Sequence, residues 1–177
     1  GVNPAGTPLG PLSITTPGGT SAALAGPDLV SVVALAASGV PANASLPSAN
    51  PGQTITLEGS RFATFDRFVG PATPLVFQII DAAGIRRELI VEPTTADPAG
   101  AEMNVVVPDD AVTGPIGVVG DPQGTTIVLQ IVPLVTSVVV SGPGTVKVVG
   151  KGLIEGDGLY RFGASEVLDG SVSTAGV

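Results

Sequence analysis

Short stretches of alternating apolar and polar residues, separated by turns rich in glycine and proline, run along most of this chain. In residues 54–58, Ile55 and Leu57 point to one face, while Glu58 and the two threonines point to the other. This two-residue period is typical of a half-buried strand. Residues 75–80 are almost all apolar, which favours a central strand. No stretch shows the 3.6-residue period of a helix, so the pattern predicts an all-β protein.

Turn sequences predict two hairpins. The turn at residues 81–84 joins the apolar strand to residues 86–91. The turn at residues 121–124, Asp-Pro-Gln-Gly, lies between strands at residues 115–119 and 125–132. Strands of this length joined by short turns are the usual units of antiparallel sheets.

The strand pattern occurs more than once. Residues 29–37 form the first predicted strand, followed by a predicted loop at residues 39–52. Residues 134–140 repeat the role of the first strand, and residues 144–153 are similar to residues 53–62. The repeats are about ninety to a hundred residues apart, which is the size of an immunoglobulin-like sandwich.

A second similarity links the N-terminal segment to the end of this repeat. Gly-Pro-Leu-Ser-Ile at residues 10–14 resembles Gly-Pro-Ile-Gly-Val at residues 114–118. We therefore expect immunoglobulin-like β-sandwich repeats, one complete and two partial. Residues 1–27 would be the closing hairpin of a preceding repeat or a donor segment, residues 28–133 a complete sandwich, and residues 134–177 the opening half of a following repeat.

Several motifs resemble the IPT/TIG-type immunoglobulin-like domains of bacterial surface proteins. Residues 50–62 match the family's Pro-Gly-x-x-Val-Thr-Leu-x-Gly-x-x-Phe opening, and residues 105–108 and 113–118 match its second half. Residues 148–153 and 160–163 are similar to its Gly-x-Gly-Phe and Val-x-Phe-Gly elements. The resemblance covers residues 28–133 well and the flanks in part.

The chain departs from this family in two places. Gln78 stands where the family has glycine, and the loop at residues 39–52 is long. The resemblance implies a sandwich fold and an extracellular or cell-surface location. It does not identify a ligand, because such sandwiches serve as adhesins, as spacers in polysaccharide enzymes and as filament subunits.

Composition narrows the function further. The chain is 44% hydrophobic but only 3% aromatic, so the core must consist of valine, isoleucine, leucine and alanine. It has 7 Lys and Arg against 15 Asp and Glu, a net charge of −8. An acidic surface without a basic stripe disfavours binding to nucleic acid or to anionic lipid.

Several residue types needed for catalysis are absent. Cysteine and histidine do not occur, which removes the commonest nucleophile–base pairs and metal ligands. No Gly-x-Ser-x-Gly elbow occurs, and the few aromatics offer no stacking platform for sugars. We therefore do not expect an enzyme.

No targeting or membrane segment is predicted. The longest apolar stretch, residues 127–140, is shorter than the roughly 20 residues a spanning helix needs, so no membrane insertion is expected. The chain has no initiator methionine or visible signal peptide, and we expect a processed or trimmed product.

Two kinds of site remain open. Asp97, Asp109, Asp110 and Asp121, and the Glu-Gly-Asp-Gly loop at 155–158, are candidate calcium ligands, although carboxylates that begin turns are the favoured interpretation. No other cofactor is expected. Asn43 begins an Asn-Ala-Ser sequon, which is a candidate glycosylation site or a chance occurrence.

The two partial repeats have two explanations: the chain is an excised part of a longer array whose neighbouring repeats are lost, or the two halves are an assembly mechanism. A sandwich cut in half exposes its inner face and unpaired strand edges. One subunit's N-terminal hairpin can complete the next subunit's C-terminal half, which generates an open filament. A composite unit also needs a counterpart of residues 102–107, which residues 171–177 match poorly. The candidate assembly residues are Leu12, Ile14, Leu24, Val135, Val138, Val146, Val148, Tyr160 and Phe162.

The sequence thus predicts a non-catalytic structural subunit of an extracellular or cell-surface fibre or stalk. The expected partners are other copies of the chain or neighbouring repeats. The alternative is an adhesin or carbohydrate-contacting module of a longer surface protein, whose loops would bind the ligand.

Overall fold

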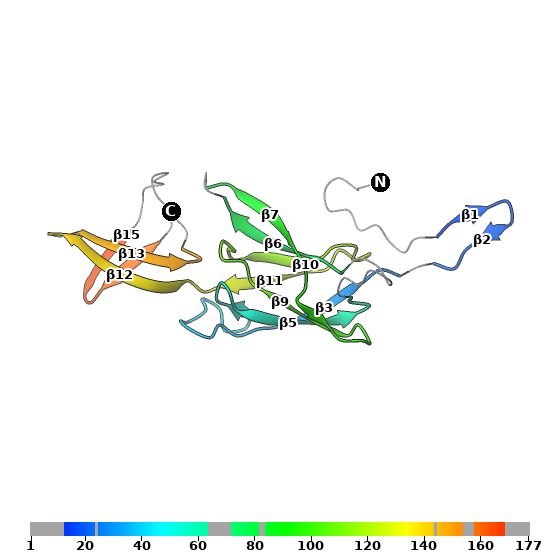
Figure 1. Ribbon diagram of the computed structural model, residues 1–177, viewed down its shortest axis with the longest axis horizontal. Coiled ribbons are helices and arrows are strands. Elements are labelled where there is room, and N and C mark those ends of the chain that lie inside the picture. Colours follow the sequence, from blue (N-terminus) through cyan, green and yellow to red (C-terminus); the bar gives the residue numbers. More distant parts are fainter. Residues whose placement is uncertain are drawn as a thin grey trace.

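The computed structural model describes residues 13–23, 25–63, 72–81, 84–143, 145–153 and 158–168. These residues form strands and no helix, so the all-β prediction is confirmed. Figure 1 shows three parts in a row: a hairpin near the N-terminus, a central two-sheet body, and a C-terminal unit at the opposite end. The strands are β1 (Thr15–Thr16), β2 (Gly19–Thr20), β3 (Asp28–Val33), β4 (Ser48–Ala49), β5 (Thr54–Ser60), β6 (Leu75–Ile80), β7 (Arg86–Val91), β8 (Thr95–Ala96), β9 (Glu102–Val106), β10 (Gly114–Val118), β11 (Thr126–Ile131), β12 (Leu134–Gly142), β13 (Thr145–Lys151), β14 (Leu159–Phe162) and β15 (Ser165–Leu168).

The central body is a sandwich of two sheets. One sheet has the strand order β3-β5-β9-β8 and the other has the order β4-β11-β10-β6-β7. The two layers are separated in Figure 1, with the five-stranded sheet drawn above the four-stranded one. Ile55 and Leu57 are buried between them, as their alternation with polar residues predicts. The core side chains come from both sheets and include Leu29, Ile55, Leu57, Leu75, Phe77, Met103, Val105, Ile116 and Leu129.

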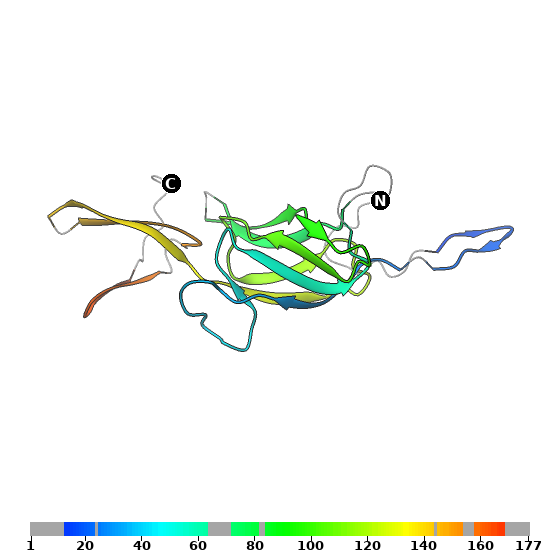
Figure 2. The ribbon, with the colours of Figure 1, turned by 60° about the horizontal axis from the view of Figure 1, so that its bottom comes forward.

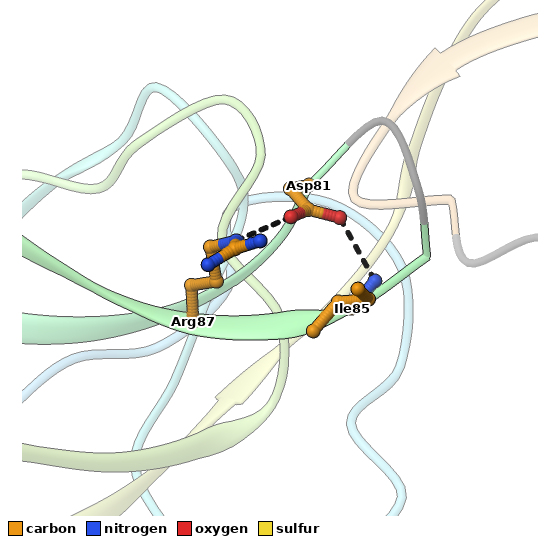
Figure 3. Close-up of polar contacts among 3 residues, drawn as sticks. All are labelled: Asp81, Ile85 and Arg87. Atoms are coloured by element: carbon orange, nitrogen blue, oxygen red, sulfur yellow. Dashed lines mark hydrogen bonds and ion pairs between the residues drawn. The ribbon is translucent and has the colours of Figure 1, made fainter.

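Both predicted hairpins are present. Strands β6 and β7 pair antiparallel, as do β10 and β11. Asp81 holds the end of the first hairpin, because its Oδ1 accepts a hydrogen bond from the Ile85 amide at 2.9 Å while its Oδ2 pairs with Arg87 (Figure 3). The Asp81 amide in turn donates to the Ile85 carbonyl at 3.0 Å.

The predicted loop at residues 39–52 differs from expectation because it contains β4. This two-residue strand runs parallel to β11, and both its residues are fully buried. Gln130 on β11 anchors the preceding loop: its Oε1 accepts from the Asn43 amide at 2.8 Å, and its Nε2 donates to the Asn43 carbonyl at 2.6 Å. The segment is therefore fixed to the sandwich edge.

The first strand is shorter than predicted. It ends at Val33, after which the Ala34 carbonyl accepts from the Ser48 amide at 3.1 Å and the Ala36 amide donates to the Ser48 hydroxyl at 3.1 Å. The chain therefore leaves β5 after Val33 and bonds to β4 instead.

Candidate assembly interface

The C-terminal hairpin β12–β13 has the same local structure as the central hairpin β3–β5. Each hairpin is antiparallel, and each carries a one-residue irregularity after its second pair. The pairs that occupy the same places are Leu29–Gly59 and Val135–Gly150, and Val32–Leu57 and Val138–Val148. The register places Val135, Val138 and Val148 on the face that is the core face in the central body.

A glycine has the same structural role in both hairpins. A Cβ on Gly59 would collide with the partner strand's backbone and with the ring of Phe62, three residues later. A Cβ on Gly150 would lie 2.5 Å from a backbone oxygen of its partner strand and 3.0 Å from Cδ1 of Leu153, also three residues later. Phe62 and Leu153 therefore pack so closely against the backbone of Gly59 and Gly150 that only glycine fits at these two positions.

The residue two places after each of these glycines has a left-handed backbone. Arg61 has φ of 60° and Gly152 has φ of 66°. Arg61 is the only residue other than glycine with positive φ among the described residues. A left-handed turn at this point directs Phe62 and Leu153 back over the glycine.

Strands β14 and β15 complete the C-terminal unit and face β12–β13 across an apolar groove. The groove has a volume of about 500 Å³, and a smaller hollow of about 250 Å³ adjoins it. All six predicted assembly residues of this part of the chain line one or both hollows: Val135, Val138, Val146, Val148, Tyr160 and Phe162. The structure thus brings these six side chains together.

The same face is covered in the central body and open here. Leu29 and Leu57 are 2% and 0% exposed, while Val135 and Val138 are 52% and 56% exposed. In the central body the cover comes from the opposite sheet, including Ile116 of β10 and Leu129 of β11. The described residues contain no equivalent of β10–β11 in the C-terminal unit.

The hairpin β1–β2 lies at the other end of the molecule. Its strands pair through Thr15–Thr20 and Thr16–Gly19, and the Ser21 amide donates to the Ile14 carbonyl at 2.9 Å. Every residue from 13 to 23 is exposed, and Ile14 is 61% exposed. Figures 1 and 2 place this hairpin at the opposite end of the chain from strands β12–β14, which border the groove. The other two predicted assembly residues of this segment, Leu12 and Leu24, lie outside the described residues.

The junction between the central body and the C-terminal unit is short and braced. Only Val132 and Pro133 separate β11 from β12. Lys151 at the end of β13 forms an ion pair with Asp109 at 2.8 Å. Asn50, which is buried, donates from Nδ2 to the Val132 carbonyl at 2.9 Å. Sequence reasoning missed this bracing.

The candidate calcium ligands have other roles where the structure describes them. Asp121 is buried and its carboxylate accepts from the Gln123 and Thr125 amides at 2.7 and 3.1 Å. Asp97 accepts from the Ala99 and Ala101 amides, and the Ala99 hydrogen bond is the main cause that lowers the pKa of its carboxyl.

These carboxylates are the starts of turns, which was the favoured interpretation. Asp109 pairs with Lys151, and the adjacent Asp110 is exposed. Among the described residues, no three or more acidic, histidine or cysteine side chains are grouped as a metal site would require. Residues 155–157 of the other candidate loop lie outside the described residues.

Asn43, the candidate glycosylation residue, lies on the exposed part of the 39–52 segment. Its Oδ1 accepts from the Ser45 amide at 2.9 Å, so the sequon forms a local turn. No helix in the described part of the chain is long and apolar enough to cross a membrane.

A scan of known protein families and searches for similar curated proteins and solved structures found no match to this chain. The resemblance to IPT/TIG-type domains therefore remains a prediction from its motifs.

Proposed function

We propose that this chain is a non-catalytic structural subunit of an extracellular or cell-surface fibre or stalk. Its copies join head to tail, with the β1–β2 hairpin of one copy completing the C-terminal unit of the next. The single observation that carries the proposal is the open groove, which presents to solvent the apolar face that the central body buries.

Each of the two parts is incomplete without a cover. An isolated two-stranded hairpin is marginally stable in water, and β1–β2 has no buried residue among those described. Among the described residues, the C-terminal unit consists of two two-stranded sheets with open edges and half-exposed valines. Exposed edges and apolar faces of this kind favour association with further strands.

The geometry favours a filament over a closed dimer. The hairpin and the strands that border the groove lie at opposite ends of the chain (Figure 2), so contact between hairpin and groove joins two different surfaces and is heterologous. A heterologous contact that does not close on itself generates an open chain of subunits. The braced Val132–Pro133 junction supports a stiff connection along such a chain.

A composite unit would also need a strand along the second edge of β13, as β9 lies along β5 in the central body. The sequence candidate for this strand, residues 171–177, lies outside the described residues.

The proposal is tested by comparing two single variants with the unchanged chain. Ile14→Asp places a charge on the proposed donor, and Ile90→Asp places one on β7, outside both proposed surfaces. The two isoleucines are a matched pair because they are 61% and 62% exposed. We expect concentration-dependent oligomers by size exclusion with light scattering, and filaments by electron microscopy, for the unchanged chain and Ile90→Asp but not for Ile14→Asp. A monomeric unchanged chain at high concentration would refute the proposal.

A further inference from the structure

We infer that residues 13–15 of a second copy, which lead into β1, add to β14 as an antiparallel neighbour, in the register that β10 has on β6 within the central body. This inference rests on the proposed function and specifies the partner strand and its alignment. Among the described residues, β14 pairs only with β15, so its other edge is open.

The first step is the correspondence between β14–β15 and β6–β7. In the central hairpin Leu75 pairs with Val91, and both face the core. In the C-terminal hairpin Tyr160 pairs with Val167, and both line the smaller hollow. Each hairpin carries phenylalanine two residues later, at Phe77 and Phe162. Tyr160 therefore occupies the place of Leu75.

The second step is the correspondence between β1–β2 and β10–β11. Both segments follow the pattern Gly-Pro-apolar-small-apolar, which aligns Ile14 with Val118 and Ser13 with Gly117. Both continue into an antiparallel hairpin. Val118 is 7% exposed and belongs to the core, whereas Ile14 is open to solvent.

The register follows from the central sheet. There Gly117 is opposite Val76 and Val118 is opposite Leu75, and the Val119 amide donates to the Pro74 carbonyl at 2.8 Å. Transferred to the two copies, Ser13 lies opposite Arg161, Ile14 lies opposite Tyr160, and the Thr15 amide donates to the Leu159 carbonyl. Ile14 then points into the apolar groove.

The charge of Arg161 and the alternation of apolar and polar residues around Ile14 both favour this alignment. Arg161 also borders the groove, but its side chain is 69% exposed and pairs with Glu166 at 2.7 Å, so this alignment leaves its charge paired. A slip by one residue would turn Ile14 to solvent, because side chains alternate between faces. A slip by two residues would put the polar Thr16 opposite Tyr160 over the groove.

Disulfide cross-linking tests the register, because the chain contains no cysteine and two introduced thiols are the only ones present. The pair Ser13→Cys with Arg161→Cys reports the proposed register. The control pair Thr15→Cys with Arg161→Cys reports the two-residue slip. All three positions are exposed in the single chain, so circular dichroism should show unchanged folding.

Directly opposite residues in a hydrogen-bonded antiparallel pair have Cα atoms about 5.5 Å apart, which suits a disulfide. After mild oxidation we expect a ladder of covalent oligomers from the first pair, in about tenfold higher yield than from the control pair, whose Cα atoms would lie more than roughly 7 Å apart. Adding Ile14→Asp should abolish the ladder.

The outcomes distinguish the proposed register on β14 from the proposed head-to-tail assembly. A stronger ladder from the control pair would overturn the register while head-to-tail assembly stands. Oligomers without cross-links from either pair would show that β14 is not the acceptor edge. If neither the unchanged chain nor any variant associates, the proposed function itself is wrong.

Discussion

Leu57 and Val148 occupy equivalent places in two hairpins of the same geometry, but only Leu57 is fully buried, at 0% exposure. Truncating a fully buried leucine to alanine costs about 2–5 kcal/mol, since transfer energy and cavity energy add. For a unit of about 100 residues, a loss of about 3 kcal/mol lowers Tm by roughly 12–24 °C. We therefore expect Leu57→Ala to lower the main unfolding transition strongly.

Val148→Ala should behave differently. Val148 lines the open groove and is neither in the central core nor among the partly buried residues packed against it. The substitution removes two methyl groups, which contribute at most about 1.6 kcal/mol of hydrophobic free energy, and only when they become fully buried. We expect the main transition to stay within about 3 °C of the parent, and oligomerisation to weaken by up to about tenfold.

Differential scanning calorimetry on dilute samples measures the transitions, and light scattering over a concentration series measures association. Equal shifts of the main transition in both variants would refute the reasoning that only one of the two equivalent faces is covered. A shift below about 4 °C for Leu57→Ala would refute the assignment of the core itself.

Three further predictions concern the junction and the loops. Asn50→Ala should lower the free energy of unfolding, measured in urea, by about 1–3 kcal/mol, because the substitution leaves the buried Val132 carbonyl without its hydrogen-bond donor. A loss near zero would contradict this prediction. Lys151→Ala should lower the free energy of unfolding by less than about 1 kcal/mol, and this loss should vanish in high salt, because the ion pair between Lys151 and Asp109 is exposed. A larger loss that does not depend on salt would contradict this. Asp97→Asn should destabilise the chain at neutral pH, because folding lowers the pKa of the Asp97 carboxyl. The stability that the ionised carboxylate contributes is fully present above the unfolded aspartate pKa of about 4, and it is lost as pH falls below that value toward the lower folded-state pKa. The difference between the parent and Asp97→Asn should therefore shrink as urea unfolding is repeated from pH 7 to pH 3, and a constant difference would contradict this.

The sequence predicted those elements that carry their own periodicity. Ile55 and Leu57 alternate with polar residues, so their strand and its buried face followed directly. The similarity of residues 144–153 to residues 53–62 aligns Val148 with Leu57, and the two hairpins place this pair at equivalent positions. Both depend only on local pattern, which is the information a single sequence contains.

The elements that were missed depend on distant partners. Strand β4 has only two residues and therefore no period, and its loop is anchored by Gln130, 87 positions away from Asn43. The bond of Asn50 to Val132 and the pairing of Lys151 with Asp109 also join segments far apart in the chain. No local signal distinguishes such polar residues from ordinary loop residues.

Hydrogen–deuterium exchange of β14 as a function of concentration tests the central claim most directly. If the β1–β2 hairpin of a second copy covers this strand, its amides should exchange rapidly in dilute solution and become protected as concentration rises. Ile14→Asp should keep them rapid at every concentration. Exchange of β14 that does not change with concentration in the unchanged chain would contradict the account.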